Sequence, residues 1–282
     1  MEELTGVLYL VATPIGNLED ITYRALRILG EVDFIAAEDT RHTLKLLNHF
    51  NISKPMISYY EHNIRERGEK IIAKLKEGKN CALVTDAGTP AISDPGEDIV
   101  KLCVSEGIRV IPIPGAVAGI NALICSALST SRFSFEGFLS VNKKSRAEHL
   151  ESVKNSRYTM IFYEAPHKLL NTLCDMLASF GDRKITIARE ITKKYEEFLY
   201  TTLSGAISHF ELQAPKGEFV LIIEGATEDT KTSVFDNISV LEHINYYIES
   251  GMDKKEAMKT VAKERGVSKR DIYAETIQNK EN

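Results

Sequence analysis

The sequence has no tryptophan and few cysteines, and neither its cysteines nor its histidines have the spacing of a metal site. The four cysteines lie within apolar patterns, with no C-x-x-C pair and no adjacent histidine: Cys81, Cys103, Cys125 and Cys174. Such cysteines are typical of reduced, buried thiols. The seven histidines also lack zinc-ligand spacing. We therefore expect neither disulfides nor a metal.

Long apolar runs and an excess of positive charge are also missing. No run is long enough to cross a membrane, and the first four residues, MEEL, are too acidic for a signal peptide. The formal net charge is -5, so no global basic field attracts nucleic acid, although a local basic face would suffice for RNA. These features predict a soluble cytoplasmic protein without a membrane partner.

Several familiar catalytic motifs are absent. The sequence has no G-x-x-x-x-G-K-[ST], no G-x-G-x-x-G after a predicted strand and no G-x-S-x-G. These absences argue against a Walker-type nucleotide site, the usual dinucleotide fingerprint and a serine nucleophile elbow.

The most informative stretch that is present covers residues 81–96. An apolar run predicts a buried strand, residues 86–90 predict a turn, and a helix is expected to begin with Asp94 as its N-cap and Pro95 in its first position. The small residues Ala87 and Gly88 would let a ligand approach the backbone. An ordinary turn between strand and helix is the alternative interpretation.

Similar loops rich in Gly and Pro follow two other predicted strands, at residues 13–17 and 114–119. Apolar runs alternate with amphipathic helices throughout the first half, which predicts a mainly parallel sheet covered on both faces. The carboxyl edge of such a sheet is where ligands bind. The three loops carry few charges, so we expect a ligand held by backbone groups and shape.

The pattern predicts three parts in an α/β protein. Residues 1–130 form the first α/β domain, and residues 131–227 contain strands with short connections, which favours a mixed sheet. A polar, Thr-rich linker precedes residues 236–282, which we interpret as a small C-terminal helical module. That module resembles a helix-turn-helix unit, although plain helical packing explains its pattern equally well.

Six ordered blocks carry a resemblance to a known family. They are LYLVATPIGNLEDIT (8–22), AEDTRHT (37–43), LVTDAGTPAISDPG (83–96), FYEAPH (162–167), REITK (189–193) and KGEFVLIIEG (216–225). Together they resemble the small-subunit ribosomal RNA methyltransferase I family of the tetrapyrrole methylase superfamily. The resemblance covers about residues 5–225 and extends more loosely into the C-terminal helices.

The resemblance implies an enzyme that uses S-adenosylmethionine to methylate the ribose 2′-oxygen of a cytidine in the decoding region of 16S rRNA. It also implies two α/β domains of the tetrapyrrole-methylase type with the cofactor between them, and a homodimer. The partner would be 16S rRNA or the small ribosomal subunit. Position by position, the cofactor residues would be Pro14, Asp86, Gly88, Thr89, Ile92, Gly115, Val117, Ala118, Tyr163 and Glu164.

The central loop departs from the pattern of many superfamily members. Where they carry Gly-Asp-Pro, this chain has Gly88-Thr89-Pro90, so a carboxylate contact from position 89 cannot form. We infer that Asp86 is its substitute.

A ribose hydroxyl is a poor nucleophile near neutral pH, so a base, or a cation beside the developing alkoxide, would help. The candidates at strand ends are Glu38, Asp39, Arg41, His62 and Lys193. Arg41 is favoured as a contact to RNA or to the alkoxide. The alternatives are a local ion pair among the first three and a loop role for His62.

Two other functions stay open at this point. The chain is also compatible with a methyltransferase of the same superfamily that acts on a porphyrinoid or a protein. A porphyrinoid would require a wide cleft with converging arginines, whereas the polar blocks here match the RNA enzymes. A non-catalytic ribosome-binding factor would lack cofactor binding, which the intact Gly/Pro loops argue against.

Overall fold

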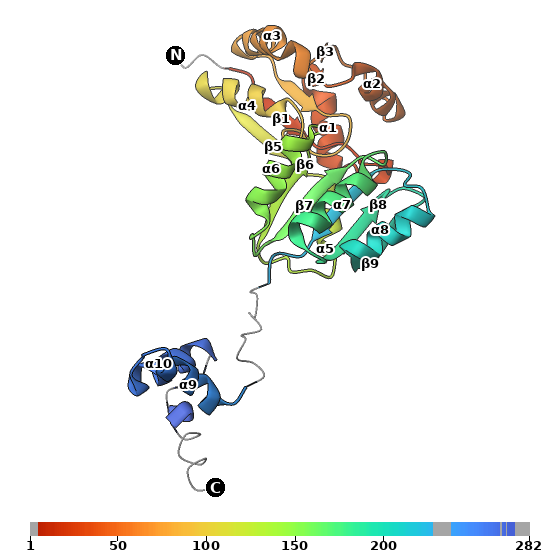
Figure 1. Ribbon diagram of the computed structural model, residues 1–282. Coiled ribbons are helices and arrows are strands. Elements are labelled where there is room, and N and C mark those ends of the chain that lie inside the picture. Colours follow the sequence, from red (N-terminus) through yellow and green to blue (C-terminus); the bar gives the residue numbers. More distant parts are fainter. Residues whose placement is uncertain (1–4, 228–237, 266, 269, 274–282) are drawn as a thin grey trace. The chain divides into compact units, whose positions relative to one another are not determined.

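The structure is a computed structural model that describes residues 5–227, 238–265, 267–268 and 270–273. The chain divides into two compact units, Met1–Ala226 and Thr227–Asn282. The first unit contains two five-stranded sheets, and the described part of the second is helical (Figure 1). No described helix is long and apolar enough to cross a membrane. The three domain boundaries expected from the sequence stay predictions.

The first sheet consists of β1 (Leu8–Val11), β2 (Phe34–Ala37), β3 (Met56–Ser58), β4 (Cys81–Val84) and β5 (Val110–Ile113). All its strand pairs are parallel, and the strand order is β3-β2-β4-β1-β5. β2 and β4 are buried along their whole length, because a parallel sheet is covered on both faces. The predicted parallel sheet is confirmed.

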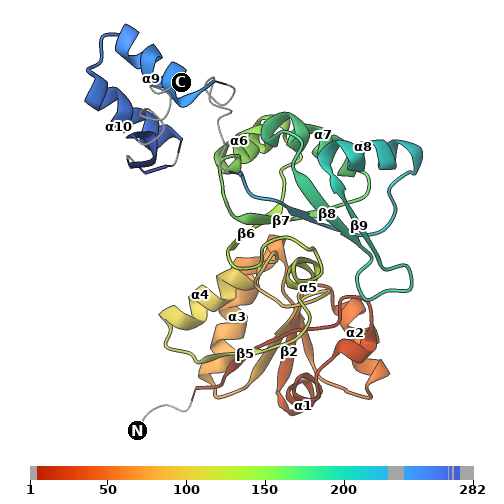
Figure 2. The ribbon, with the colours of Figure 1, turned by 90° about the horizontal axis from the view of Figure 1, so that it is seen from below.

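Four helices cover this sheet: α1 (Tyr23–Glu31), α2 (Thr40–His49), α3 (Ile64–Lys76) and α4 (Gly96–Ser105). α1 and α2 lie on one side of the sheet, and α3 and α4 lie on the other (Figure 2). Alternate strand residues supply the two cores, so Ile35 packs with α1 and α2 while Phe34 and Ala36 pack with α3 and α4.

The start of α4 differs slightly from the sequence prediction. The helix begins at Gly96, with Pro95 rather than Asp94 at the N-cap position. The Asp94 carboxylate nevertheless accepts hydrogen bonds from the backbone N–H groups of Gly96, at 2.8 Å, and Ala91, at 3.0 Å. Asp94 therefore stabilises the turn and the helix start together, one residue earlier than a standard cap.

The second sheet has the order β6-β7-β10-β8-β9, and it is formed by β6 (Phe133–Phe138), β7 (Thr159–Glu164), β8 (Lys184–Arg189), β9 (Glu197–Thr202) and β10 (Phe219–Ile223). Only β6 and β7 pair in parallel, and the other neighbours are antiparallel. The mixed sheet predicted for the second half is therefore confirmed.

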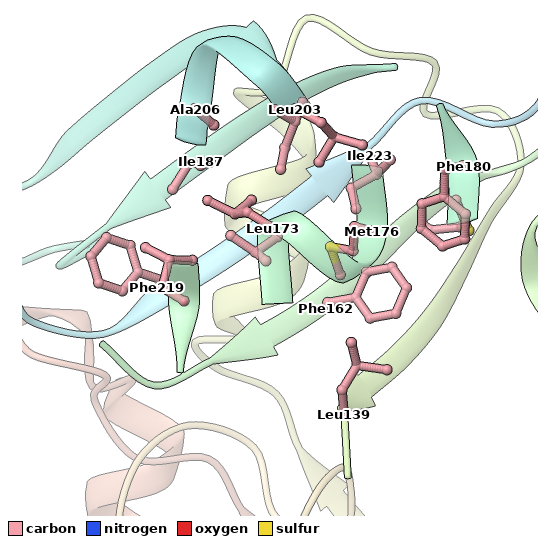
Figure 3. Close-up of a cluster of buried hydrophobic side chains, with 14 of the residues drawn as sticks. Leu139, Phe162, Leu173, Met176, Phe180, Ile187, Leu203, Ala206, Phe219 and Ile223 are labelled. Atoms are coloured by element: carbon pink, nitrogen blue, oxygen red, sulfur yellow. The ribbon is translucent and has the colours of Figure 1, made fainter. Parts of the chain in front are cut away.

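One face of the second sheet is covered by α6 (Lys143–Val153), α7 (Leu169–Phe180) and α8 (Leu203–Leu212). Figure 3 shows Leu173 and Met176 of α7 beside Phe162 of β7, with Leu203 of α8 in the same cluster. The opposite face packs against α5 (Ala118–Ile124), which follows the last strand of the first sheet. Because α5 leaves one sheet and packs on the other, it ties the two sheets together.

The C-terminal unit contains α9 (Val240–Glu249) and α10 (Lys254–Glu264), which enclose a small apolar cluster. Ser239 and Glu242 form the predicted capping box at the start of α9. His243 is fully buried, and its Nε2 lies 3.1 Å from Oε2 of Glu264. Burial and the positive charge of Arg265 lower the pKa of His243. Of the third predicted helix, residues 268–277, the structure describes 268 and 270–273, and 270–273 are helical.

Candidate active site

Three Gly/Pro loops lie side by side because they follow β1, β4 and β5, which are neighbours in the first sheet. The first two are joined by paired backbone hydrogen bonds between Thr13 and Gly88, of 2.8 and 3.1 Å. Gly88 adopts a φ of 85°, which glycine tolerates without strain. Ala91 adopts a φ of 67°, an uncommon value for a residue with a side chain. The backbone of the loop after β4 is therefore held in one specific conformation.

A cavity of about 430 Å³ opens where these loops meet the second sheet. Loops of both sheets line it, and its wall combines small residues, apolar side chains and carboxyl groups: Ile15, Glu38, Thr85, Asp86, Ala87, Gly88, Thr89, Ile92, Ser93, Asp94, Val117, Ala118, Phe138, Tyr163, Glu164, Ala165, Pro166, Ile191, Glu218, Phe219 and Val220. It is large enough to enclose much of a nucleoside-sized ligand.

The structure brings together most of the residues expected to bind the cofactor. Those that line the cavity are Asp86, Gly88, Thr89, Ile92, Val117, Ala118, Tyr163 and Glu164. Pro14 lines a second cavity of about 350 Å³, and Gly115 lines a third of about 460 Å³. Gly115 packs closely on Ala12, the residue after β1, since a Cβ added there would lie 2.6 Å from the Cβ of Ala12. The binding roles of all ten residues stay predictions.

Glu38 and Asp86 stand together at the ends of β2 and β4. A carboxylate oxygen of Glu38 accepts a 2.6 Å hydrogen bond from the Thr85 hydroxyl and a longer one from the backbone N–H of Asp86. Asp86 in turn accepts a 3.1 Å hydrogen bond from the backbone N–H of Asp39. Burial and the neighbouring negative charge of Glu38 raise the pKa of Asp86.

Asp39 and Arg41 form a local ion pair at the start of α2. Asp39 is the N-cap of that helix, and its carboxylate contacts the Arg41 guanidinium at 2.7 Å. The Arg41 side chain is 88% exposed. Arg41 does not line any of the three cavities, so in this structure it shapes the helix start and faces solvent.

His62 and Lys193 lie in different surroundings. His62 belongs to a short 3-10 helix, η2 (Glu61–Asn63), where its exposed ring meets that of Tyr60 edge to face. It lines none of the three cavities. Lys193 bonds to Glu190 at 3.0 Å and to Glu218 at 2.9 Å, and Glu218 borders the 430 Å³ cavity.

The segment around Lys193 is strained and packs on the first loop. Glu190 and Thr192 adopt φ values of 51° and 68°, which are costly for a β-branched residue such as Thr192. A Cβ added to Gly16 would lie 2.4 Å from the Cγ of Lys193. The second sheet therefore reaches across to the first loop at this point, and Gly16 has no side chain there because Lys193 occupies the space.

Tyr163 and Glu164 end β7 at the cavity wall. The Tyr163 hydroxyl accepts a 3.0 Å hydrogen bond from the backbone N–H of Gly119, in the first turn of α5, and burial raises its pKa. Glu164 is almost fully buried, and its carboxylate accepts hydrogen bonds from the Thr172 hydroxyl and the backbone N–H of Ala165. Both residues are therefore held firmly by their neighbours.

Comparison with known proteins identifies the family. Residues 7–207 match the family described as Tetrapyrrole (Corrin/Porphyrin) Methylases. The chain is 53% identical over 270 residues to "Ribosomal RNA small subunit methyltransferase I" of Halalkalibacterium halodurans, which covers 95% of this chain and 93% of the relative. The chain belongs to the ribosomal RNA small subunit methyltransferase I family. The resemblance drawn from the six sequence blocks is confirmed.

A further relative has the same family name, and solved structures support the fold. The protein of that name from Bacillus subtilis is 48% identical, over 95% of this chain and 93% of its own length. A diphthine synthase structure has a TM-score of 0.62 at 14% identity, covering 79% of this chain and 91% of that chain. A uroporphyrin-III-C-methyltransferase from Thermus thermophilus has a TM-score of 0.56 at 17% identity, covering 78% and 94%. The solved structures establish the tetrapyrrole methylase fold.

Some cavity residues of this methyltransferase I chain were not singled out from the sequence. Four of them lie inside the sequence blocks that carried the resemblance, so those blocks could have indicated them: Pro166, Glu218, Phe219 and Val220. No sequence feature indicated Phe138, because an alternating strand pattern does not show which side chain borders a cavity of another domain.

The charge of the cavity limits what it can bind. Among the described residues that line it, five carry carboxyl groups, and none is lysine, arginine or histidine: Glu38, Asp86, Asp94, Glu164 and Glu218. The same wall has apolar surface from Ile15, Ile191 and Phe219. A ligand with positive charge and an apolar ring fits this wall, whereas a polyphosphate does not. Among the described residues, no cluster could hold a metal ion.

Proposed function

We propose that this protein uses S-adenosylmethionine to methylate the ribose 2′-oxygen of a cytidine in the decoding region of 16S rRNA. We further propose that it acts in the cytoplasm, as a homodimer, on 16S rRNA or the small ribosomal subunit. The observation that carries the proposal is the 53% identity to a ribosomal RNA small subunit methyltransferase I over 95% of the chain. That alignment leaves little of the chain outside it.

The cavity fits the cofactor on its own properties. S-adenosylmethionine supplies a sulfonium methyl group, and transfer to a hydroxyl oxygen breaks the carbon–sulfur bond with both electrons left on sulfur. Its sulfonium and ammonium groups are cations, which the five carboxyl residues of the wall favour electrostatically. A solved uroporphyrin-III C-methyltransferase of the same fold is described as complexed with S-adenyl homocysteine.

Different residues of the chain would make different kinds of contact with the cofactor. Gly88, Val117 and Ala118 present backbone and small side chains, so the ligand comes close to the loops. Ile191 and Phe219 supply apolar contact from the second sheet. The proposed cofactor residues Pro14 and Gly115 act on this view through the loops, because they border neighbouring cavities.

The contact between the two sheets serves to exclude water. Lys193 lies on Gly16 and holds Glu190 and Glu218, so the strained segment closes one side of the cavity. Excluding water strengthens the electrostatic interactions inside the site and keeps the reacting groups aligned. On this proposal Lys193 positions the wall, and it is not the group that removes the hydroxyl proton.

The test is methyl transfer from labelled S-adenosylmethionine to small ribosomal subunits that lack the modification, with the labelled nucleotide and its ribose position mapped. Label on a decoding-region cytidine 2′-oxygen is the expected result. Cofactor binding by calorimetry without RNA labelling would overturn the RNA acceptor. Gly88→Arg is expected to abolish cofactor binding, because Gly88 has a φ of 85° and lies at the cavity wall. Retained binding would contradict the site.

A further inference from the structure

The second cavity, of about 350 Å³, lies beside the first. It is formed between the first Gly/Pro loop and α2, and its lining consists of Thr13, Pro14, Gly16, Leu18, His42, Thr43, Lys45, Leu46, His49, Thr85 and Asp86. No ligand is assigned to this cavity by the function proposed above. Its size is comparable to that of the first, so it can admit a nucleotide-sized group.

The second cavity is lined by basic side chains, which the described lining of the first lacks. His42, Lys45 and His49 follow one another at i, i+3 and i+7 on α2, so they lie on the same face of the helix. All three are exposed, and Lys45 forms no ion pair with any described residue. Asp86 is the sole carboxyl residue among the described lining. The Lys45 ammonium and the two imidazoles can donate hydrogen bonds to an anion such as a phosphate.

Two residues, Thr85 and Asp86, line both cavities. The first cavity carries five carboxyl residues and suits a cationic methyl donor, and the second carries a basic helix face. A methyl donor in one and an acceptor in the other would face each other across the end of β4. Asp86 is the ionisable residue at that junction.

We propose that the second cavity receives the acceptor nucleotide, that His42, Lys45 and His49 bind its phosphates, and that Asp86 accepts the proton of the ribose hydroxyl. This inference rests on the proposed function and names the acceptor half of the same site. It differs from the prediction made from the sequence, which favoured Arg41 as a contact to RNA and assigned Asp86 to the cofactor.

The hydrogen bonds distinguish Asp86 from its neighbours as the base. Glu38 borders only the first cavity, and its carboxylate is engaged by the Thr85 hydroxyl at 2.6 Å. Asp39 is paired with Arg41 at 2.7 Å. In Asp86, Oδ1 accepts the backbone N–H of Asp39, and Oδ2 has no hydrogen-bond donor among the described residues. One oxygen is thus fixed and the other is free to accept a proton.

The electrostatic surroundings are consistent with this role. Burial and Glu38 raise the pKa of Asp86, and Asp39 adds to the increase. The backbone N–H of Asp39 and the side chain of His42 lower the pKa of Asp86. The negative charge of Asp86 in turn raises the pKa of Arg41. The net direction is upward, which makes the carboxylate a stronger base than an ordinary aspartate.

The step balances without another reactant. The ribose oxygen forms its bond to the methyl carbon while its proton passes to the Asp86 carboxylate. The carbon–sulfur bond breaks with its electron pair on sulfur, so the positive charge of the donor and the negative charge of Asp86 disappear together. Asp86 then loses the proton to water, and the phosphate contacts on α2 take no part in the bond changes.

The phosphate contact is tested with Lys45→Gln and the matched control Lys70→Gln, an exposed lysine of α3 outside all three cavities. Lys45→Gln is expected to raise the KM for RNA and to reduce the salt slope of RNA binding by about 1, as for one lost phosphate contact. S-adenosylhomocysteine binding by calorimetry should not change. Equal salt slopes for both variants would overturn the assignment of this cavity.

The base is tested with Asp86→Asn, which is isosteric and still accepts the Asp39 N–H. At saturating cofactor we expect kcat to fall by about 10²- to 10⁴-fold, as for loss of a general base, with RNA binding retained and cofactor binding weakened far less than kcat. A kcat within a few-fold of wild type would overturn the role of Asp86. Weakened cofactor binding with unchanged kcat at saturating cofactor would overturn the role as base and make Asp86 a cofactor residue instead.

These outcomes separate the inference from the proposed function. A wild-type protein that labels rRNA, with Lys45→Gln and Asp86→Asn both unimpaired, would overturn the acceptor cavity and leave the methyltransferase proposal intact. A wild-type protein that binds S-adenosylhomocysteine but labels no RNA would overturn both.

Discussion

The hydroxyl of Tyr163, at the end of β7, accepts a 3.0 Å hydrogen bond from the backbone N–H of Gly119, in α5. This bond joins the second sheet to the helix that leaves the first sheet. The first N–H groups of a helix have no partner within it, so Tyr163 supplies one from outside. Gly119 also leaves room for the tyrosine, since an added Cβ would lie 3.3 Å from its hydroxyl oxygen.

We predict that Tyr163→Phe destabilises the protein by about 1–3 kcal/mol, because it leaves a buried N–H of Gly119 without an acceptor. The free energy of unfolding in urea measures this. Tyr200→Phe is the matched control, since its hydroxyl donates to the Cys125 carbonyl but the side chain is 57% exposed. Equal losses in the two variants would contradict the structural role of the Tyr163 bond.

Two glycines with opposite surroundings provide a second prediction. Gly115→Ala places a Cβ 2.6 Å from the Cβ of Ala12, so we expect destabilisation of about 1–3 kcal/mol from overpacking. Gly30→Ala, in α1, meets no heavy atom within 4 Å and is expected to stabilise by about 0.5–1 kcal/mol through helix propensity. Thermal unfolding of both variants is the measurement, and a Gly115→Ala protein as stable as the wild type would contradict the close packing on Ala12.

The strands and the rim of the first cavity could be predicted from the sequence because their physics is local. Four-residue apolar runs such as Cys81–Val84 favour buried strands, and the loops after them meet at one edge of a parallel sheet. That argument places Gly88 and Val117 at the edge without knowledge of the rest of the fold.

What could not be predicted depends on contacts distant in sequence. Phe138 reaches the first cavity only because α5 packs the second sheet against the loops of the first. Pro14 and Gly115 lie in the right loops but border other cavities, since loop position does not show on which side of the backbone a residue lies. The sequence likewise left Arg41 between a contact to RNA and a local ion pair; the structure shows its ion pair with Asp39, and a contact to RNA stays a prediction.

The ion pairs of Lys193 predict how stability depends on pH. Burial alone would raise the pKa of Glu190, but the backbone N–H of Glu218 and the Lys193 ammonium outweigh it, and the net shift is downward. A lowered carboxyl pKa contributes stability that is present above the ordinary glutamate value, about 4.3, and is lost as pH falls through the folded value.

Lys193→Met keeps the aliphatic side chain over Gly16 and removes the ammonium charge. The variant should therefore be less stable than the wild type at pH 7. Its free energy of unfolding should also fall less than that of the wild type between pH 7 and pH 3. Urea unfolding at pH 7 and at pH 3 measures both effects. Lys194→Met, at the exposed neighbour, is the control and should follow the wild type at both values. A constant stability difference between Lys193→Met and wild type across this range would contradict the pH linkage.

The pH dependence of methyl transfer tests the relation between Glu38 and Asp86. If Asp86 is the base, kcat falls as pH decreases through its pKa, and burial together with the charge of Glu38 has raised that pKa. Glu38→Gln removes the neighbouring negative charge while its amide oxygen still accepts from Thr85. The pKa of Asp86 should therefore fall, and the acidic limb of the kcat profile should move to lower pH.

The profile is measured at saturating cofactor, because Glu38 borders the cofactor cavity and its loss weakens the attraction for a cation. Glu97→Gln, on an exposed position of α4, is the control and should leave the limb in place. Since neutralising a carboxylate beside another can only make the second easier to ionise, an unchanged limb in Glu38→Gln would show that a group other than Asp86 takes the hydroxyl proton.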